Sequence, residues 1–515
     1  MLAQDAAESE QLLRIQNHFA AASEWLLSFA ETDGFAVQQN EIEICQQADK
    51  LILSCPTPRG WQRWTILAWE KTGDKLIFQT ARKLLAKAGK IEFTPRLLTK
   101  DLREQTKQAR LLKAAELAES ARRAFSLHAK IKSFSLSPSN QRGKVGTIAR
   151  CRLALPNGES IAVCGSILEK TEPASLLANS IIWLAKFTEQ QQIGELWLVA
   201  ESAAITELQK LLALLRDGWR TQIKLMRRRE TTENGEVKMN LEPVANLDLT
   251  DLWREKTPKL HSPPTRQISL TARAILELAP DAIDVSYSKH GETLRFQGLP
   301  FVRIKKILEA EQTWFGIDAR QKRILDETSV IEFSRLLETL REHRRSNAAD
   351  KRSQLYKAAP EAWLESILRR DVSRLDPNLI LAPVFAQFRL SQKQGSLDLF
   401  AARTDGRLVV IELKTAPDRE HVFQAANYWR QIELQRRAGN FARARLFGDL
   451  SILNQPPLVY LVAPLMSFHR DFELLAGALA PEMEVWRFDL NEDWRAGIRV
   501  ARRTCFTTQN GSQRL

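Results

Sequence analysis

Residues 395–428, with the sequence GSLDLFAARTDGRLVVIELKTAPDREHVFQAANY, decide how the C-terminal part of this chain folds. They contain two short apolar runs, 397–402 and 408–413, and Thr404-Asp405-Gly406 separates the two. An Asp-Gly pair between two such runs is a strong signal for a β-hairpin. The segment therefore predicts two antiparallel strands joined by a tight turn.

The turn also fixes which residues face each other across the hairpin. If Gly406 takes the left-handed position of a three-residue loop, Arg403 pairs with Arg407. Counting five residues outward from each places Asp398 opposite Glu412. Directly opposed side chains share one face of a sheet, with Cβ atoms roughly 4.5–5.5 Å apart. We therefore expect two carboxylates side by side.

Lys414 projects from the same side of its strand as Glu412, because side chains alternate between faces. Two close carboxylates repel each other, and a hard cation such as Mg²⁺ removes that repulsion. Lys414 could then orient or deprotonate an attacking water, or offset charge in a transition state. The alternative is an edge hairpin whose three charges form a solvated salt bridge. The apolar run 409–413, typical of a strand covered on both sides, argues against that alternative.

The pattern of Asp398 followed by Glu412-Leu413-Lys414 resembles the core of the PD-(D/E)XK nuclease superfamily. Gln424 and Tyr428, on a helix predicted over 421–434, resemble the Gln-x-x-x-Tyr motif of its RecB-like and archaeal-type branches. Glu365, on a helix predicted over 361–370, resembles the early glutamate of the family. The resemblance covers about 356–502, and it departs from the family pattern at Leu397, where the nominal proline would stand.

This resemblance implies a restriction-endonuclease-like fold, in which helices flank a mixed central sheet, and a metal-dependent nuclease activity with Mg²⁺ or Mn²⁺. The implied metal ligands are Asp398, Glu412, the backbone carbonyl of Leu413, and Glu365. Lys414 would position the attacking water, and Gln424 and Tyr428 would orient the substrate phosphate or Lys414.

Residues 116–229 look like a copy of the pattern in 362–489. We call the N-terminal one the first copy and the C-terminal one the second copy. Aligning Gly158 with Gly406 matches the turns, the strands and the helices that follow. The alignment places Arg150, Cys164 and Ser166 at the positions of Asp398, Glu412 and Lys414. We interpret this as a tandem duplication whose first copy lacks metal ligands and forms an internal pseudo-dimer with the second. Two unrelated α/β units of similar pattern are the alternative.

The whole chain is predicted to be α/β, with small β-rich modules beside the two nuclease-like copies. The predicted parts are an α+β module over 1–100, the first copy over 101–253, a Pro-rich linker over 254–266, an α/β accessory module over 267–355 and the nuclease domain over 356–515. In the first module, 11–30 reads as helical. Trp61, Trp64 and Trp69 read either as a base-stacking platform or as core residues.

The net charge of +13, from 75 basic and 62 acidic residues, favours a polyanionic partner. Basic residues cluster just after the motif helix, and most such runs are simply solvated surface. Beside a phosphodiester-cleaving motif they favour phosphate contacts, and we predict nucleic-acid binding, with DNA favoured over RNA. The predicted contacts are Arg430, Arg436, Arg437, Arg443 and Arg445.

Several classes of protein are excluded by what the sequence lacks. The five cysteines are widely spaced, which argues against a zinc or redox centre. The sequence contains no Gly-rich phosphate loop of the kind that indicates ATP binding. It also contains no apolar run that reaches the length of a membrane span. The N-terminus lacks a signal-peptide pattern, so a cytoplasmic protein is expected.

The sequence therefore predicts a metal-dependent nuclease. The main alternative is a nuclease-like scaffold that binds nucleic acid without cleaving it. A hydrolase that uses His421 or His469 is a weaker interpretation, because the histidines show no partner spacing. The oligomeric state stays open.

Overall fold

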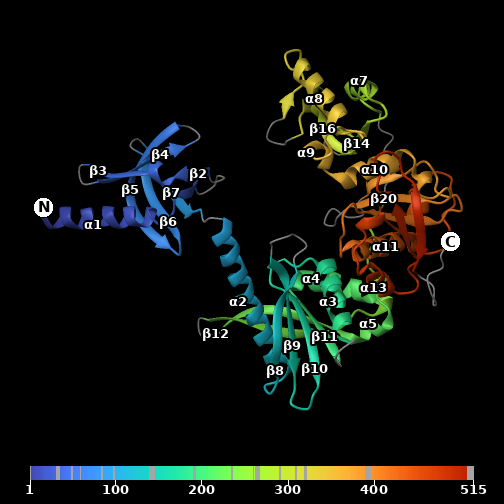
Figure 1. The fold of residues 1–515 in the computed structure, drawn as a ribbon, viewed down its shortest axis with the longest axis horizontal. Coiled ribbons are helices and arrows are strands. Elements are labelled where there is room, and N and C mark those ends of the chain that lie inside the picture. Colours follow the sequence, from blue (N-terminus) through green and yellow to red (C-terminus); the bar gives the residue numbers. More distant parts are fainter. Residues whose placement is uncertain are drawn as a thin grey trace. The chain divides into compact units, whose positions relative to one another are not determined.

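A computed structural model describes residues 2–29, 35–47, 50–57, 60–82, 85–96, 99–138, 145–168, 170–188, 193–233, 236–258, 260, 267–288, 291–307, 310–317, 322–388 and 396–506. The chain divides into two compact units, residues 1–112 and 113–515. The strands in these ranges form four sheets (Figure 1). Most of the linker predicted over 254–266 lies outside the described residues, and the domain boundaries stay predictions.

The described residues of the N-terminal unit up to Arg96 form a seven-stranded antiparallel sheet and one α-helix. Its strand order is β2-β1-β7-β6-β5-β4-β3. The elements are α1 (Leu2–Phe19), β1 (Glu24–Phe29), β2 (Phe35–Gln38), η1 (Gln39–Glu41), β3 (Glu43–Gln47), β4 (Lys50–Thr57), β5 (Gly60–Thr72), β6 (Lys75–Arg82) and β7 (Leu85–Pro95). The helix predicted over 11–30 is wrong beyond Phe19, because residues from Glu24 onward pair as a strand with β2 and β7.

The three tryptophans of β5 do not form one exposed platform. Trp64 is buried in the core of the sheet, and Trp69 packs partly against the same core. Trp61 is 60% exposed. The core interpretation is therefore confirmed for Trp64, while Trp61 presents its indole to solvent.

The first copy is a six-stranded mixed sheet with helices on both faces. Its strand order is β8-β9-β10-β11-β12-β13. The elements are α2 (Thr99–Phe125), β8 (Lys130–Pro138), β9 (Val145–Ala154), β10 (Ser160–Ser166), α3 (Pro173–Thr188), β11 (Glu195–Ala200), α4 (Ser202–Ala213), α5 (Asp217–Gln222), β12 (Ile223–Glu233), β13 (Glu236–Val244) and α6 (Leu249–Leu252).

An accessory module follows, and its described residues form five antiparallel strands in sequence order and three α-helices. Its elements are α7 (Leu270–Leu278), β14 (Ile283–Ser288), β15 (Gly291–Phe296), β16 (Leu299–Ile307), β17 (Ala310–Phe315), β18 (Arg323–Ile324), α8 (Val330–His343) and α9 (Gln354–Lys357). Arg344 is almost fully buried, and its guanidinium donates to backbone carbonyls that include those of Phe296 and Ala358. These bonds fasten the end of α8 to the chain that leads into the next domain.

The second copy repeats the architecture of the first. Its strand order is β19-β20-β21-β22-β23-β24. The elements are α10 (Pro360–Arg370), η3 (Val372–Arg374), β19 (Phe385–Phe388), β20 (Leu397–Ala402), β21 (Leu408–Leu413), α11 (His421–Arg437), α12 (Asn440–Arg443), β22 (Leu458–Pro464), η4 (Leu465–Ser467), α13 (Phe472–Gly477), β23 (Val485–Leu490) and β24 (Val500–Cys505).

The two sheets have the same strand order and the same strand directions. In each sheet the first three strands are antiparallel, the third, fourth and fifth run parallel, and the sixth is antiparallel to the fifth. In each copy one helix precedes the sheet and another follows the central hairpin. The predicted mixed α/β fold, present twice beside β-rich modules, is confirmed.

The two copies share one hydrophobic core. Apolar faces of α3 and α4 from the first copy pack with α11 and α13 from the second. An antiparallel bridge between Leu215 and Leu479 joins the ends of α4 and α13. Its two hydrogen bonds are reciprocal, since Arg216 N donates to Ala478 O and Ala480 N donates to Leu214 O. The residues that follow corresponding helices of the two copies therefore meet each other, as they would across the axis of a homodimer.

Candidate active site

The central hairpin of the second copy has the register that its turn sequence predicts. Leu399 pairs with Ile411, and Arg403 N donates to Arg407 O over 2.8 Å. Gly406 has φ +84°, and a Cβ there would lie 1.9 Å from the carbonyl oxygen of Ser451. Only glycine fits this turn without strain.

Asp398 and Glu412 are the next residues along this register, and they come together at the end of the hairpin. Asp398 Oδ2 accepts a hydrogen bond of 2.8 Å from Leu413 N. Glu412 is only 4% exposed, and its Oε2 is buried with no hydrogen-bond partner among the described residues. Burial, together with the nearby charge of Asp398, raises the pKa of Glu412 well above its ordinary value. The charge of this carboxylate is therefore only partly compensated.

Lys414 completes the cluster. Its Nζ lies 3.5 Å from Glu412 Oε1 and 3.5 Å from Asp418 Oδ2. Burial lowers the pKa of Lys414, but four surrounding carboxylates outweigh burial and raise it overall. Those carboxylates belong to Glu412, Asp418, Asp398 and Glu361. Lys414 is therefore an ammonium ion. It is suited to stabilising a negative charge and not to accepting a proton from water.

His421 supports the cluster from the first turn of α11, and sequence reasoning gave it no such role. It is buried, and burial is the main reason that its pKa falls to about 4. The neutral ring lies with Nε2 3.1 Å from the carbonyl oxygen of Glu412, which can only accept, so Nε2 must carry the proton. His421 thereby fixes the backbone on which Glu412 is mounted. A single histidine at a helix start gives no sequence signal of this role.

Gln424 and Tyr428 lie on α11, one turn apart. Both side chains form hydrogen bonds to residues close in sequence to the Asp398–Glu412–Lys414 cluster. Gln424 Nε2 donates to Glu420 Oε2 over 3.4 Å, and its Oε1 is buried without a hydrogen-bond partner in the described structure. The Tyr428 hydroxyl donates to Ser396 O over 3.0 Å. Tyr428 therefore fixes the residue at the entrance to β20, two residues before Asp398.

The structure does not bring Glu365 together with this cluster. Helix α10 packs on the sheet face that carries Leu399 and Ile411, whereas Phe400 and Val410 face the other way, toward α11. Glu412 belongs to the α11 side because side chains alternate along a strand and Val410 faces α11. Glu365 is buried and lies 3.7 Å from Arg295 of the accessory module.

Another carboxylate of α10, which sequence reasoning missed, does reach the end of β21. Glu361 lies one turn before Glu365, and its Oε1 accepts bonds from the amide and the hydroxyl of Thr415. In the described parts of the chain, no group of three His, Cys, Asp or Glu side chains is arranged to hold a metal ion. The predicted ligand set is thus reduced to Asp398, Glu412 and the carbonyl of Leu413.

The predicted phosphate-binding arginines separate into two groups. Arg430 is 1% exposed and pairs with Glu255 over 2.7 Å, so the structure places its guanidinium away from solvent. Arg436 is held by Glu433 and Asn454. Arg437 also bonds Glu433 but is about half exposed, and Arg443 and Arg445 are exposed. Arg437 is the last residue of α11, roughly 24 Å from its first residue at 1.5 Å per residue, and Arg443 and Arg445 follow it.

The first copy has the same hairpin without the carboxylates. Arg150 pairs directly with Cys164 across β9 and β10, as the alignment on Gly158 predicts. Cys164 is fully buried, and burial raises its thiol pKa to about 11. Ser166 is also buried. None of these three side chains is an anionic oxygen ligand at neutral pH.

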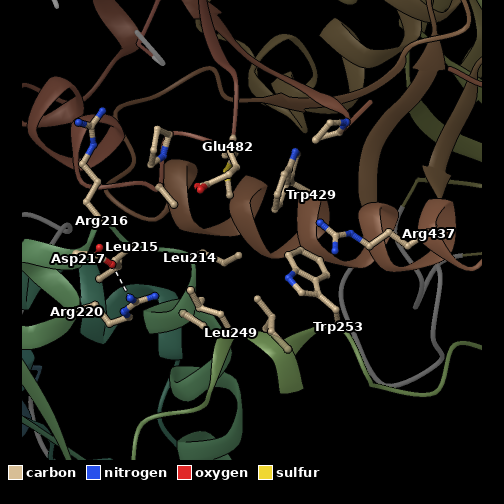
Figure 2. Close-up of a pocket in the computed structure, with 16 residues that line it drawn as sticks. Leu214, Leu215, Arg216, Asp217, Arg220, Leu249, Trp253, Trp429, Arg437 and Glu482 are labelled. Atoms are coloured by element: carbon tan, nitrogen blue, oxygen red, sulfur yellow. Dashed lines mark hydrogen bonds and ion pairs between the residues drawn. The ribbon is translucent and has the colours of Figure 1, made fainter. Parts of the chain in front are cut away.

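A separate cavity of about 570 Å³ lies at the junction between the copies (Figure 2). The indoles of Trp253 and Trp429 approach edge-to-face, with centroids 6.0 Å apart, and Arg437 lies over the Trp253 ring. Arg220 pairs with Asp217 on the opposite wall. This cavity contains none of the predicted catalytic residues, so we assign the candidate active site to the hairpin.

No family model and no curated protein matches the sequence. Among solved structures, the apo form of EndoMS is similar at 11% sequence identity, over 39% of this chain and 90% of that chain, with a TM-score of 0.14. A similarity at that TM-score supports no functional argument. No helix in the described ranges is long and apolar enough to cross a membrane.

Proposed function

We propose that this protein is a metal-dependent nuclease whose active site is formed by Asp398, Glu412 and Lys414. The observation that carries the proposal is the Glu412 carboxylate, which is buried beside Asp398 and has one oxygen without a bond. A buried charged group without full compensation destabilises the fold unless an ion or a proton joins it. Such an arrangement at the end of a strand hairpin is typical of a site built for a ligand.

The donor set fits Mg²⁺ or Mn²⁺. Asp398 and Glu412 would supply carboxylate oxygens, and the backbone carbonyl of Leu413 would supply a third ligand. Mg²⁺ is commonly held by one or two carboxylates together with waters and substrate phosphate oxygens. The bound ion would lower the pKa of a coordinated water and offset the charge of the scissile phosphate.

The protein's own residues would position the reacting groups and stabilise charge. The Lys414 ammonium would attract the phosphate and stabilise the negative charge that develops on it. Asp418 and Glu412 hold that ammonium from two sides, each 3.5 Å away. His421 and Tyr428 hold the backbone on either side of the carboxylate pair, which keeps the two strands in register at the site.

We infer that the substrate is a nucleic acid, with DNA favoured over RNA. The net charge of +13 supports a polyanionic partner. The exposed Arg437, Arg443 and Arg445 would contact phosphates at a distance from the reacting group, since Arg437 is the last residue of α11 and the other two follow it.

The test is cleavage of single-stranded, duplex and branched DNA, and of matched RNA, with Mg²⁺ or Mn²⁺ against EDTA. We expect metal-dependent cleavage that Lys414→Ala reduces by about 10²–10³-fold, the usual effect of removing a group that stabilises transition-state charge. The matched control is Ser166→Ala, which changes the equivalent residue of the first copy and should leave the rate unchanged. Circular dichroism would verify that both variants fold.

The alternative is a nucleic-acid-binding scaffold without catalysis. It would be supported if the wild-type protein bound DNA or RNA but cleaved none of these substrates with either metal. Cleavage that persists unchanged in Lys414→Ala would place the active site elsewhere.

A further inference from the structure

The segment that links β21 to α11 reaches across to the first copy. Arg419, in this segment, donates from Nη1 to Asn179 Oδ1 of α3 over 2.9 Å. Its Nε lies 3.2 Å from His469 Nε2. The neighbouring residue, Asp418, pairs with Lys414, so Arg419 lies next to the candidate active site in the chain.

Arg150 of the first copy meets the same asparagine from the other side. Its Nη2 donates to Asn179 O over 3.3 Å, and its guanidinium lies 5.8 Å from the centroid of the Trp183 ring. Its Nε is buried and has no hydrogen-bond partner within the described residues. Arg150 also occupies the hairpin position that Asp398 occupies in the second copy.

The positive charge of this pair is not neutralised. In the parts of the chain that the structure describes, neither Arg150 nor Arg419 forms an ion pair with a carboxylate. The acids that flank Arg419 are bonded elsewhere, Asp418 to Lys414 and Glu420 to Gln424. Burial lowers the pKa of Arg150, and the charge of Arg419 lowers it further. Two guanidiniums that share one asparagine and lack an acid form a site for an anion.

We propose that Arg150 and Arg419 bind one backbone phosphate of the nucleic acid, next to the phosphate that is cleaved. The proposal rests on the proposed function, because that function supplies the polyanionic substrate. It gives the first copy a defined role: where the second copy has the metal-binding Asp398, the first contributes a cation to the same substrate.

The test measures binding and not cleavage. Fluorescence anisotropy in EDTA would give the affinity for a labelled DNA duplex and a labelled single strand over a range of salt concentrations. The variants are Arg150→Gln, Arg150→Lys and Arg419→Gln. The matched control is Arg216→Gln, which also removes one positive charge and one hydrogen bond between the copies, from Arg216 Nε to Leu479 O.

We expect Arg150→Gln and Arg419→Gln each to weaken binding about 10-fold at low salt, as the loss of a charged hydrogen bond does. Each should reduce the slope of log affinity against log salt by up to about 0.9 for duplex or about 0.7 for a single strand, the value for one phosphate. Arg150→Lys should retain the slope, because it keeps the charge. A residue with only a structural role would not change the slope.

The inference is overturned if wild-type protein binds DNA and neither glutamine variant changes the slope, or if Arg216→Gln changes it equally. Thermal unfolding of each variant identifies a folding defect; if Arg150→Gln does not fold, the Arg419→Gln slope decides. Failure of the proposed function gives a different result, since wild type would then bind without metal-dependent cleavage. Absence of any binding would overturn both.

Discussion

The two copies have the same six-stranded sheet, yet only the second keeps acidic side chains at the end of its hairpin. Cys164 fills its position as a buried neutral thiol, whereas Glu412 fills the equivalent position with an unbonded carboxylate oxygen. The first copy therefore shows that the fold does not need those charges. Their presence in the second copy, at a cost in stability, indicates a function there.

Converting the second hairpin to the residues of the first should have the largest effect. In the double variant Glu412→Cys/Lys414→Ser, we expect metal-dependent cleavage to fall by at least about 10³-fold, because ligand and cation are lost together. The measurement is single-turnover cleavage at saturating metal. The fold should persist, because the first copy packs the same side chains in the same sheet.

The control for this exchange changes the first copy instead. Cys164→Ala/Ser166→Ala should leave cleavage within about twofold of wild type, because neither side chain supplies a metal ligand. If this control lost activity as severely as the exchange, the first copy would have a catalytic role and the contrast between the copies would be wrong.

The hairpin and the repeated sheet architecture could be predicted because local sequence determines both. The Thr404-Asp405-Gly406 turn fixes the register, which pairs Leu399 with Ile411. The equivalent turn at Gly158 fixes the pairing of Arg150 with Cys164. Turn chemistry and side-chain alternation act over a few residues, so a single sequence contains the information.

The remaining parts of the site depend on distant chain segments. The sequence predicts helix α10, but it does not predict the contact of Glu365 with Arg295 of the accessory module. Arg430 was placed on the right helix, but Glu255 of the first copy pairs with it and buries it. The contact between His421 Nε2 and the Glu412 carbonyl oxygen likewise depends on tertiary packing. Sequence periodicity gives the face of a helix and not the partner that covers it.

The shared core between the copies gives the second prediction. Leu479 is 3% exposed and lies in the bridge to Leu215, so Leu479→Ala should lower the free energy of unfolding by about 2–5 kcal/mol. The control is Leu465→Ala, at a site that is 42% exposed, with an expected change within about 0.5 kcal/mol. Urea unfolding followed by fluorescence measures both. Two separate transitions for 113–255 and 356–506 would show that the copies fold independently.

The smallest effect that we predict concerns the pH dependence of stability without metal. The pKa of Glu412 is raised, so above about pH 4.3, the ordinary value for glutamate, the folded state holds a proton that the unfolded state has lost. The contribution of Glu412 to the free energy of unfolding is therefore greatest at low pH. It declines as the pH rises toward the pKa that Glu412 has in the folded state. Glu412→Gln cannot titrate, so in EDTA it should be more stable than wild type near pH 7, by about 1–3 kcal/mol.

The difference in unfolding free energy between Glu412→Gln and wild type should grow from pH 4 to pH 7. Comparison of these two proteins isolates the contribution of Glu412. His421 has the opposite sign, since its pKa is lowered to about 4 and its stabilisation is lost as pH falls from 6.5. His421 is present in both proteins, so its contribution largely cancels in the difference. The matched control is Cys164→Ala, whose thiol stays neutral over this range, and its difference from wild type should not depend on pH.

Added Mg²⁺ should then reverse the order of stability. The ion would bind the folded wild type and raise its unfolding free energy with concentration, while Glu412→Gln, with one ligand neutralised, should respond weakly. A wild type that is already the more stable protein in EDTA at pH 7, and that Mg²⁺ does not stabilise, would mean that Glu412 is compensated without a ligand. The two hairpins would then differ in composition but not in function.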